Sequence, residues 1–179
     1  NDAPTIAVAT ASSSVTELAD GAVGELTSDL TTTGSIAFAD VDLTDTHTVS
    51  VTGGDGTHGA LAASIAGANV STGDGAGSID WTYTVSDGVV DYLGAGDSVV
   101  QTYTVTVTDD EGTTASQAVT ITINGTNDVP TIDVATASSS VTELADGVAG
   151  ELTSDLTTTG SIAFADVDLT DGHSVAVTG

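Results

Sequence analysis

The feature that most constrains the fold is an internal repeat with a period of 126 residues. Residues 127–179 repeat residues 1–53 with seven substitutions, namely Ala3/Val129, Ala7/Asp133, Ala22/Val148, Val23/Ala149, Thr46/Gly172, Thr48/Ser174 and Ser50/Ala176. Near-identity at a fixed long period is typical of proteins built from an array of structural units. A unit of this length can bury its own core, whereas the shorter remnant offers too little apolar surface. We therefore expect residues 1–126 to be one complete module and residues 127–179 to be the N-terminal part of the next, within a longer protein.

The two copies meet at the segment Asn124-Gly-Thr-Asn-Asp-Val-Pro130. Pro130 has a fixed φ angle and no backbone N–H, so a strand has to end or begin there. Asn127 and Asp128 carry side-chain oxygens that can form turns or bind a metal ion. We therefore interpret this segment as the joint between modules.

The chain contains no lysine and no arginine, against 26 acidic residues. Without basic side chains it cannot form ion pairs with phosphate groups, so neither nucleic-acid binding nor attachment to anionic lipid is expected. No apolar run is long enough for direct membrane insertion. Because only histidine could neutralise a carboxylate, we expect each acid to face water or to bind a metal ion. The absence of cysteine excludes disulfides and thiolate zinc sites.

Strict alternation of apolar and polar residues predicts β-strands with one buried face. The pattern is clearest in Thr102–Thr108, where Tyr103, Val105 and Val107 share one face. Further predicted strands are Val119–Ile123, Trp81–Val85, Thr48–Thr52 and the region of Ile36 and Phe38, with weaker candidates at Ile6/Val8 and Leu61–Ile65. Glycine-rich turns separate them, and no stretch has a convincing helical period. About seven strands per period predict an all-β fold: an immunoglobulin-like (cadherin-like) two-sheet β-sandwich in tandem repeat, with Trp81 in its core.

Three groups of closely spaced oxygen ligands are candidates for metal binding. They are Asp40 with Asp42, the turn Asp109-Asp110-Glu111, and Asn127 with Asp128. If the strand continues through Asp40 and Asp42, their carboxylates share one face. At about 5 Å they would repel by roughly 3 kcal/mol at an effective dielectric of about 20, and a divalent cation would relieve this repulsion. Each group alone could be an ordinary acidic turn, but three groups in a chain without basic residues favour calcium, which prefers oxygen ligands.

No motif in the sequence predicts an enzyme. The chain lacks a Gly-x-Ser-x-Gly elbow, and its acids are too numerous to single out a glycosidase pair. His47 shares its face with Val49 and Val51, so we expect it to pack at the edge of the core. His173 repeats His47, and no histidine has partners spaced for a zinc site.

Several motifs in combination resemble the VCBS repeat, a cadherin-like module of very large bacterial surface proteins and RTX-type adhesins. They are Asn-Asp-x-Pro, Val-Thr-Glu17, Phe38-Ala-Asp-Val-Asp42 followed by Asp45 and His47, Trp81-Thr-Tyr-Thr-Val85, Tyr92-Leu-Gly-Ala-Gly-Asp97 and the stretch 103–112. The resemblance extends over the whole period. It implies an extracellular, immunoglobulin-like sandwich repeated in tandem at the bacterial cell surface, with calcium at the joints.

The joint also resembles those of cadherins, in which acids of neighbouring modules share calcium ions. Carried over by position, this resemblance implies the ligands Glu17, Asp109, Asp110, Glu111, Asn127, Asp128, Asp166 and Asp168. The repeat adds Glu143 as the counterpart of Glu17, and Asp40 and Asp42 as the counterparts of Asp166 and Asp168. A departure is Asn124-Gly-Thr126, where a cadherin linker would offer another acid.

Two functions of different classes are compatible with these features. The first is a non-catalytic structural extender repeat of a giant bacterial adhesin or surface fibre, whose partners are neighbouring repeats of the same or adjacent chains. The second is a module that itself binds a carbohydrate or a partner surface. Near-identical copies favour the extender, with any glycan or cell-surface ligand bound through other domains. We also expect residues 54–126 to pair with residues 1–53 because short connections are preferred, which leaves 127–179 dependent on a partner.

Overall fold

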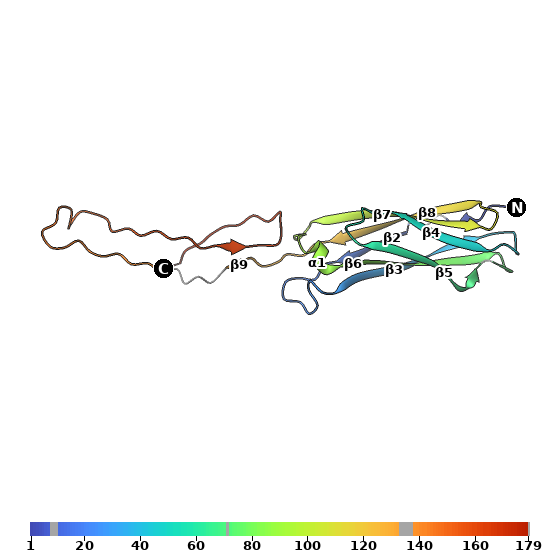
Figure 1. Ribbon diagram of the computed structural model, residues 1–179, viewed down its shortest axis with the longest axis horizontal. Helices are drawn as coiled ribbons and strands as arrows, with labels where there is room; N and C mark the ends of the chain where they lie inside the picture. Colours follow the sequence, from blue (N-terminus) through green and yellow to red (C-terminus); the bar gives the residue numbers. More distant parts are fainter. Residues whose placement is uncertain (8–10, 71, 133–137, 179) are drawn as a thin grey trace. The chain divides into compact units, whose positions relative to one another are not determined.

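A computed structural model describes residues 1–7, 11–70, 72–132 and 138–178. The chain divides into two compact units, the first formed by Asn1–Asp128 with Val167–Gly179 and the second by Val129–Asp166 (Figure 1). The described chain is all-β apart from one short helix. Its elements are β1 (Thr5–Ile6), β2 (Ala11–Thr16), β3 (Asp29–Ala39), β4 (His47–Gly53), β5 (Ala60–Val70), β6 (Ala76–Ser86), α1 (Asp87–Val90), β7 (Ser98–Asp109), β8 (Thr114–Asn124), β9 (Thr131–Ile132) and β10 (Phe164–Ala165). Within the described residues, no helix has the length and apolar character needed to cross a membrane.

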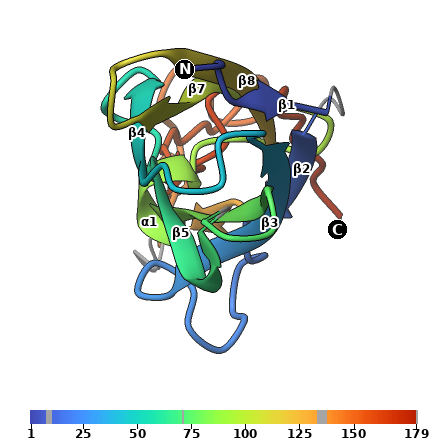
Figure 2. The ribbon, with the colours of Figure 1, turned by 90° about the vertical axis from the view of Figure 1, so that its right-hand side faces the viewer.

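The first unit contains two four-stranded sheets. Their strand orders are β1-β3-β6-β5 and β2-β8-β7-β4. Neighbouring strands are antiparallel except β2 and β8, which run parallel from Ala11↔Val119 to Thr16↔Asn124. With the strands seen end-on, Figure 2 shows β7 and β8 on one side and β3 and β5 on the other, an arrangement consistent with a β-sandwich. The strands of residues 5–53 therefore pair with those of residues 60–124.

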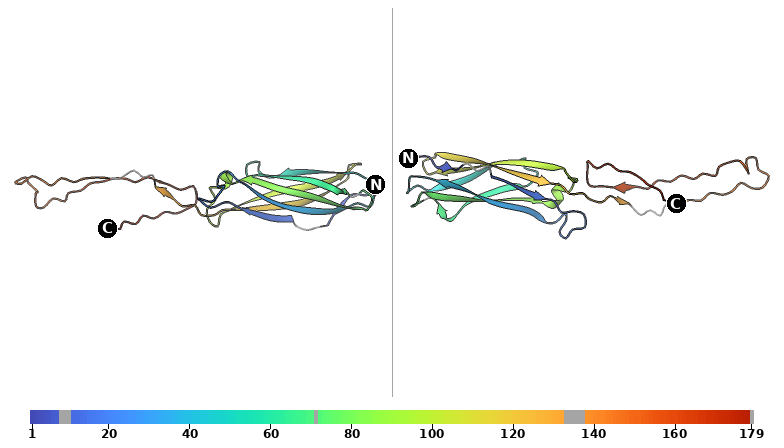
Figure 3. Two further views of the ribbon diagram at one scale, coloured as in Figure 1. Left: turned by 90° about the horizontal axis from the view of Figure 1, so that it is seen from below. Right: turned by 180° about the vertical axis from the view of Figure 1, so that it is seen from behind.

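The inward-facing side chains of both sheets form the apolar core of this unit. The alternation in β7 is confirmed, because Val105 and Val107 are fully buried and Tyr103 is 4% exposed. Trp81 of β6 is also in the core, as predicted, and its ring packs over Gly34 of β3. A Cβ added to Gly34 would lie 2.3 Å from Trp81 Cζ2, so this position has no room for a side chain. Figure 3 shows the long strands running side by side along the unit.

Several elements differ from the sequence-based expectations. Neither β2 nor the four-residue α1 was predicted, and the weak candidate around Leu61 is the full-length strand β5. The candidate at Ile6 forms the short β1, whereas Val8 lies outside the described residues. β3 ends at Ala39, so the following acids lie in a turn rather than on one face of a continuing strand.

The second unit has nearly the same sequence as the beginning of the first but much less regular structure. Its strands β9 and β10 have two residues each and pair antiparallel, and β9 begins directly after Pro130. Ile162 and Phe164 are 61% and 50% exposed, whereas their counterparts Ile36 and Phe38 are 5% and 3% exposed. Among the described residues of this unit, no strand covers Phe164 as β6 covers Phe38.

Candidate metal sites

The first acidic cluster lies at the end of the parallel pair β2–β8. Because both strands run in the same direction, Glu17 and the segment after Asn124 leave the sheet together, and Glu17 N donates to Asn124 O at 3.0 Å. Further along, Asp128 N donates to Asp168 Oδ2 at 2.8 Å. Potential ligand oxygens of Glu17, Asp128 and Asp168 lie within 4.8 Å of one another. The cluster therefore combines acids from both copies of the repeat.

All three side chains of this cluster are buried, each with 3% of its surface exposed. Glu17 Oε1 accepts hydrogen bonds from the N–H and the hydroxyl of Thr126, both at 3.2 Å, and Asp128 Oδ1 accepts one from Asp20 N at 2.8 Å. Glu17 Oε2 and Asp128 Oδ2 have no hydrogen-bond partner among the described residues. Buried carboxylate oxygens without partners are unfavourable unless they are protonated or bind a cation.

Burial raises the pKa values of two carboxyl groups in this cluster. Burial raises the pKa of Glu17 to about 7 against the opposing hydrogen bonds from Thr126, and the charges of Asp128 and Asp168 raise it further. Burial also raises the pKa of Asp128 to about 6, against the hydrogen bond from Asp20 N and with the charge of Asp168 adding to the increase. The three oxygens lie close enough together for one metal ion to contact all of them.

A second acidic region lies where β3, β4 and β7 border their loops. Potential ligand oxygens of Asp40, Asp42 and Asp45 lie within 4.8 Å of one another, and so do those of Asp45, Asp109 and Glu111. Asp45 belongs to both groups, is 7% exposed, and has an Oδ2 without a hydrogen-bond partner among the described residues. Burial, followed by the surrounding negative charges, raises the pKa of Asp45. This region therefore also contains a buried oxygen that a cation could bind.

Two acids of the second region do have compensating partners. Asp40 accepts hydrogen bonds from Asp42 N at 3.0 Å and from His47 Nε2 at 3.0 Å, and both hold the pKa of Asp40 below its usual value. Thr113 donates its hydroxyl and its N–H to Asp109, which lowers the pKa of Asp109. Asp40 and Asp109 therefore stay ionised to lower pH than an unperturbed aspartate.

The predicted placement of His47 at the edge of the core is confirmed. Its ring lies against Phe38, with ring centroids 5.1 Å apart, while its Nε2 faces Asp40. A single histidine thus links the core to the second acidic region.

Residues that the cadherin resemblance assigns to one joint are separated in this chain. Asp109 is the last residue of β7 and Glu111 lies in the turn after it, at the end of the hairpin remote from Asn124, because Thr108 pairs with Thr114 and Ser98 with Asn124. Glu17 lies beside Asn124, at the opposite end of the hairpin. The expectation that these acids gather at one joint does not hold within the described residues.

The remaining predicted ligands belong to neither cluster. The neighbouring Asp110 side chain, followed by burial, raises the pKa of Glu111. Asn127 is exposed, and its Nδ2 donates to Asp128 O at 2.5 Å. Glu143 is exposed and Asp166 half-buried in the second unit, and neither joins a group of three potential ligands among the described residues.

Asp45 is a potential ligand that the sequence reasoning did not include. Asp45 N donates to Asp42 O at 3.1 Å, so a tight turn brings the third acid back to the first two. The available signal was the spacing Asp-x-Asp-x-x-Asp, which recurs in the second copy and ends there at Asp171. Three closely spaced acids offer more ligand oxygens to one cation than an isolated Asp-x-Asp does.

Asp87 contradicts the expectation that each acid faces water or binds a metal ion. It is fully buried at the start of α1 and accepts hydrogen bonds from Leu18 N and Leu26 N, both at 2.8 Å. These bonds fix the loop between β2 and β3, in which Leu26 has a positive φ of 61°. Backbone N–H groups can stabilise a buried carboxylate without a cation, an alternative that composition does not reveal.

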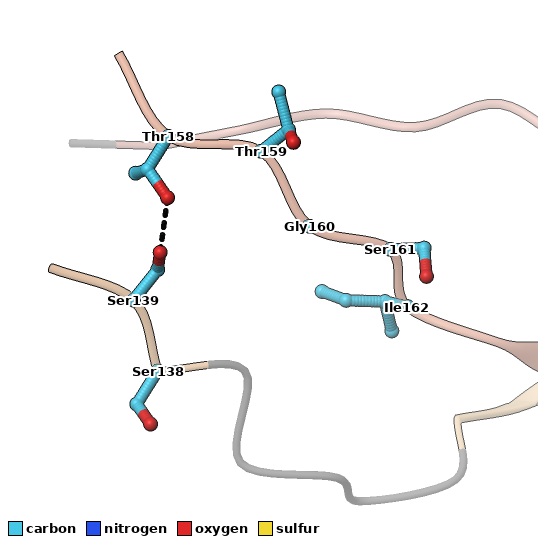
Figure 4. Close-up of a pocket in the computed structure, with 7 residues that line it drawn as sticks. All are labelled: Ser138, Ser139, Thr158, Thr159, Gly160, Ser161 and Ile162. Carbon is cyan, nitrogen blue, oxygen red and sulfur yellow. Dashed lines mark hydrogen bonds between the residues drawn. The ribbon is translucent and has the colours of Figure 1, made fainter. Parts of the chain in front are cut away.

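A pocket in the second unit is lined by Ser138, Ser139, Thr158, Thr159, Gly160, Ser161 and Ile162 (Figure 4). The hydroxyl groups of Ser139 and Thr158 are hydrogen-bonded to each other at its edge. Gly160 has open space beside it, whereas its counterpart Gly34 in the first unit is covered by the ring of Trp81. We interpret the pocket as the position that a tryptophan takes in the first unit, rather than as a ligand site.

Comparisons with known proteins assign no family to this chain. No family profile and no curated protein matches the sequence. Among solved structures, the N-terminal domain of PorA matches 69% of this chain and 96% of its own, at 12% identity and a TM-score of 0.37. The secreted serine protease VesC from Vibrio cholerae matches 59% of this chain and 20% of its own, at 12% identity and a TM-score of 0.29. Likenesses this low carry no inference about function.

Proposed function

We propose that this chain is a non-catalytic extender repeat of a giant bacterial adhesin or surface fibre outside the cell. In this proposal immunoglobulin-like modules follow one another in tandem, and calcium stiffens their joints. The observation that carries it is the cluster of Glu17, Asp128 and Asp168, which combines acids from two repeat copies. Buried oxygens of Glu17 and Asp128 have no partner among the described residues, and the chain has no lysine or arginine to neutralise them. A calcium ion would supply the positive charge.

The second acidic region supports the same interpretation through the repeat. Asp2 N donates to Asp42 Oδ2 at 2.5 Å, and one period later Asp128 N donates to Asp168 Oδ2 at 2.8 Å. By this correspondence, the second acidic region is the part that a module contributes to the joint with the module before it. Glu17 belongs to the part that a module contributes to the joint with the module after it. In a tandem array the two parts would meet, which would reunite the acids that the cadherin resemblance assigns to one joint.

Binding of a carbohydrate or a partner surface by this module is the alternative. Stacking aromatic side chains are a common feature of such surfaces. Trp81, Tyr83 and Tyr103 are instead buried in the core of the first unit. We therefore propose neighbouring repeats as the partners of this module and leave ligand binding to other domains of the same protein.

Calcium-dependent unfolding tests the proposal. An ion that binds only the folded chain adds about 2.7 kcal/mol of stability at 100 times its dissociation constant. For a unit of this size that corresponds to a rise in melting temperature of roughly 10 °C. The fluorescence of Trp81, the single tryptophan, reports unfolding of the first unit, and magnesium at equal ionic strength controls for charge screening.

Two matched variants assign the response to the cluster. Asp128→Asn should lose part of the calcium response, whereas Asp2→Asn, the same substitution at the exposed counterpart, should keep it. A melting temperature of the unmodified chain that does not change across millimolar calcium would overturn the proposed function.

A further inference from the structure

A loop near the first acidic cluster contacts the second copy of the repeat directly. We name residues 92–97 the docking loop and residues 168–171 the docked turn. Leu169 N donates to the carbonyl oxygen of Tyr92 at 3.3 Å, and Thr170 Oγ1 donates to Asp97 Oδ2 at 2.6 Å. The first bond joins two main-chain groups and the second joins two side chains. Neither bond uses a carboxylate of the first acidic cluster.

Gly94 provides the surface on which the docked turn lies. A Cβ added to Gly94 would be 3.0 Å from Asp171 Oδ1 and 3.5 Å from both Cβ and Cγ of Asp168. A methyl group at this position would make one tight contact, with the end of the Asp171 side chain, whereas a larger side chain would meet the docked turn. The close approach also sets the position of Asp168, whose carboxylate belongs to the acidic cluster.

The docking loop is held in place from the other side by the first unit itself. Leu93 is buried in the core, and Asp97 N donates to Gly94 O at 2.9 Å. Gly125 N donates to Asp97 O at 3.0 Å, and a Cβ on Gly125 would be 2.1 Å from Leu93 O. The loop is thus packed against the joint segment through main-chain contacts.

A chain of side-chain hydrogen bonds fixes Tyr92 at the beginning of the docking loop. Its hydroxyl lies 3.0 Å from His58 Nε2, and His58 Nδ1 lies 2.5 Å from Asp55 Oδ2. Gln101 Nε2 of β7 donates to the same Asp55 oxygen at 2.9 Å. The carbonyl group that accepts the bond from Leu169 therefore belongs to a residue whose side chain is anchored.

The first copy shows the same turn without a docking loop. The turn of residues 42–45 is closed by a main-chain hydrogen bond of 3.1 Å, against 3.2 Å in the docked turn. Leu43 N and Thr44 Oγ1, the counterparts of the docking donors, have no hydrogen-bond partner among the described residues. In the first copy a different loop supports the turn, because Gly73 N donates to Leu43 O at 2.8 Å and Thr72 Oγ1 donates to Asp45 O at 2.7 Å. Within the described chain, the two bonds to the docking loop are found only in the second copy.

We propose that the docking loop is a cation-independent attachment site for the Asp-Leu-Thr-Asp turn of the following repeat copy. Attachment brings the carboxylate of Asp168 next to Glu17 and Asp128 before a cation binds. Thr170 and Asp97 are then positioning residues rather than ligands. The effect of Thr170 and Asp97 on calcium affinity rests on the proposed function, whereas docking measured in the presence of a chelator does not.

Amide hydrogen exchange of the full chain in the presence of a chelator tests the docking. Two amides report it, because Leu169 N–H donates to the docking loop and Asp128 N–H donates to Asp168. Thr170→Ala removes a hydrogen bond to a charged acceptor, and we expect both amides to exchange about tenfold faster. Thr44→Ala, the same substitution in the first copy, should leave both rates unchanged. A double-mutant cycle with Asp97→Ala should show that the two side chains act through one contact.

A second variant changes the docking loop instead of the docked turn. Gly94→Val introduces atoms where the docked turn lies, and it should accelerate the same two amides. The fluorescence of Trp81 shows whether the first unit remains folded in each variant. If calcium binds as proposed, Thr170→Ala and Gly94→Val should each weaken it by about tenfold while every carboxylate stays in place.

The outcomes separate docking from calcium binding. Unprotected Leu169 and Asp128 amides in the chelator, or equal effects of Thr170→Ala and Thr44→Ala, would overturn the inference. Protection in the chelator together with an unchanged melting curve in calcium would support docking and refute the proposed function. Protection that is present only with calcium would overturn docking as a cation-independent contact.

Discussion

Replacing Glu17 with glutamine should stabilise the first unit in the absence of calcium, and only at neutral to alkaline pH. Burial raises the pKa of Glu17 from its ordinary value of 4.5 to about 7. Between these values the folded chain binds a proton that the unfolded chain has released, so stability falls as the pH rises through this window. Glutamine has no charge to lose. Its amide oxygen can still accept the bonds from Thr126, and its N–H₂ group can donate to the neighbouring carboxylates.

The size of the effect follows from the separation of the carboxylates. Two ionised groups whose oxygens are at most 4.8 Å apart repel by at least about 3.5 kcal/mol at an effective dielectric of 20, and by at least about 0.9 kcal/mol at the dielectric of water. Glu17 faces two such groups, Asp128 and Asp168. Removing its charge should therefore stabilise the unit at pH 8 by about 2 kcal/mol if water enters the cluster, and by up to about 3.4 kcal/mol, which corresponds to the rise in pKa from 4.5 to about 7, if it does not. At pH 5 the effect should be much smaller, because Glu17 is then protonated in the folded chain and pH 5 is only just above its ordinary pKa of 4.5.

Urea unfolding followed by Trp81 fluorescence, at pH 5 and pH 8 in a chelator, measures this difference. Calcium should reverse its sign, because the variant lacks one charged ligand. Glu143→Gln is the matched control, since Glu143 is the exposed counterpart and its charge should not affect unfolding. Equal effects at the two pH values, or an effect of Glu143→Gln as large as that of Glu17→Gln, would refute the reasoning.

The repeat provides two further pairs of matched substitutions, both measured by urea unfolding. Phe38→Ala should destabilise the first unit by about 3–5 kcal/mol because it leaves a cavity in the core, whereas Phe164→Ala should change its stability by less than about 0.5 kcal/mol. Gly34→Ala should cost roughly 1–3 kcal/mol and shift the emission of Trp81, because the new methyl group meets the indole ring, while Gly160→Ala should be neutral. Equal effects within either pair would contradict the difference in burial between the two copies.

Local alternation located the central strands but not the whole sheet. β6, β7 and β8 place apolar and aromatic residues on one face and mostly threonines and serines on the other, which is a strong local signal. β2 is mostly alanine and serine and is held by parallel pairing with β8, from Ala11↔Val119 onward. A contact between residues so distant in sequence leaves no periodic pattern. α1 was missed for a related reason, because Asp87 at its start is held by the main chain of a distant loop.

The acidic ligands were predictable by type but not by location. Composition indicated that acids in this chain need a partner, the resemblance to cadherin joints named Glu17, Asp128 and Asp168 among the candidates, and the structure brings these three together. Whether Asp109 joins them depends on strand direction. In the β7–β8 hairpin, Asp109 lies at the turn and Asn124 lies at the open end. The two residues are therefore separated by the length of the strands. Register and direction come from pairing, which the sequence pattern alone does not specify.

The two repeat copies separate what a sequence pattern determines from what its partners determine. Residues 36–38 and 162–164 are identical, yet Phe38 is buried and Phe164 is half exposed. The alternation selects which side chains share a face in both copies, but burial requires the strand that carries Trp81. The open space beside Gly160 has the same cause, because a glycine makes room for an indole ring only where the ring is present. Near-identical sequence with different burial therefore indicates that the 126-residue period, rather than either half of it, is the unit that specifies a core.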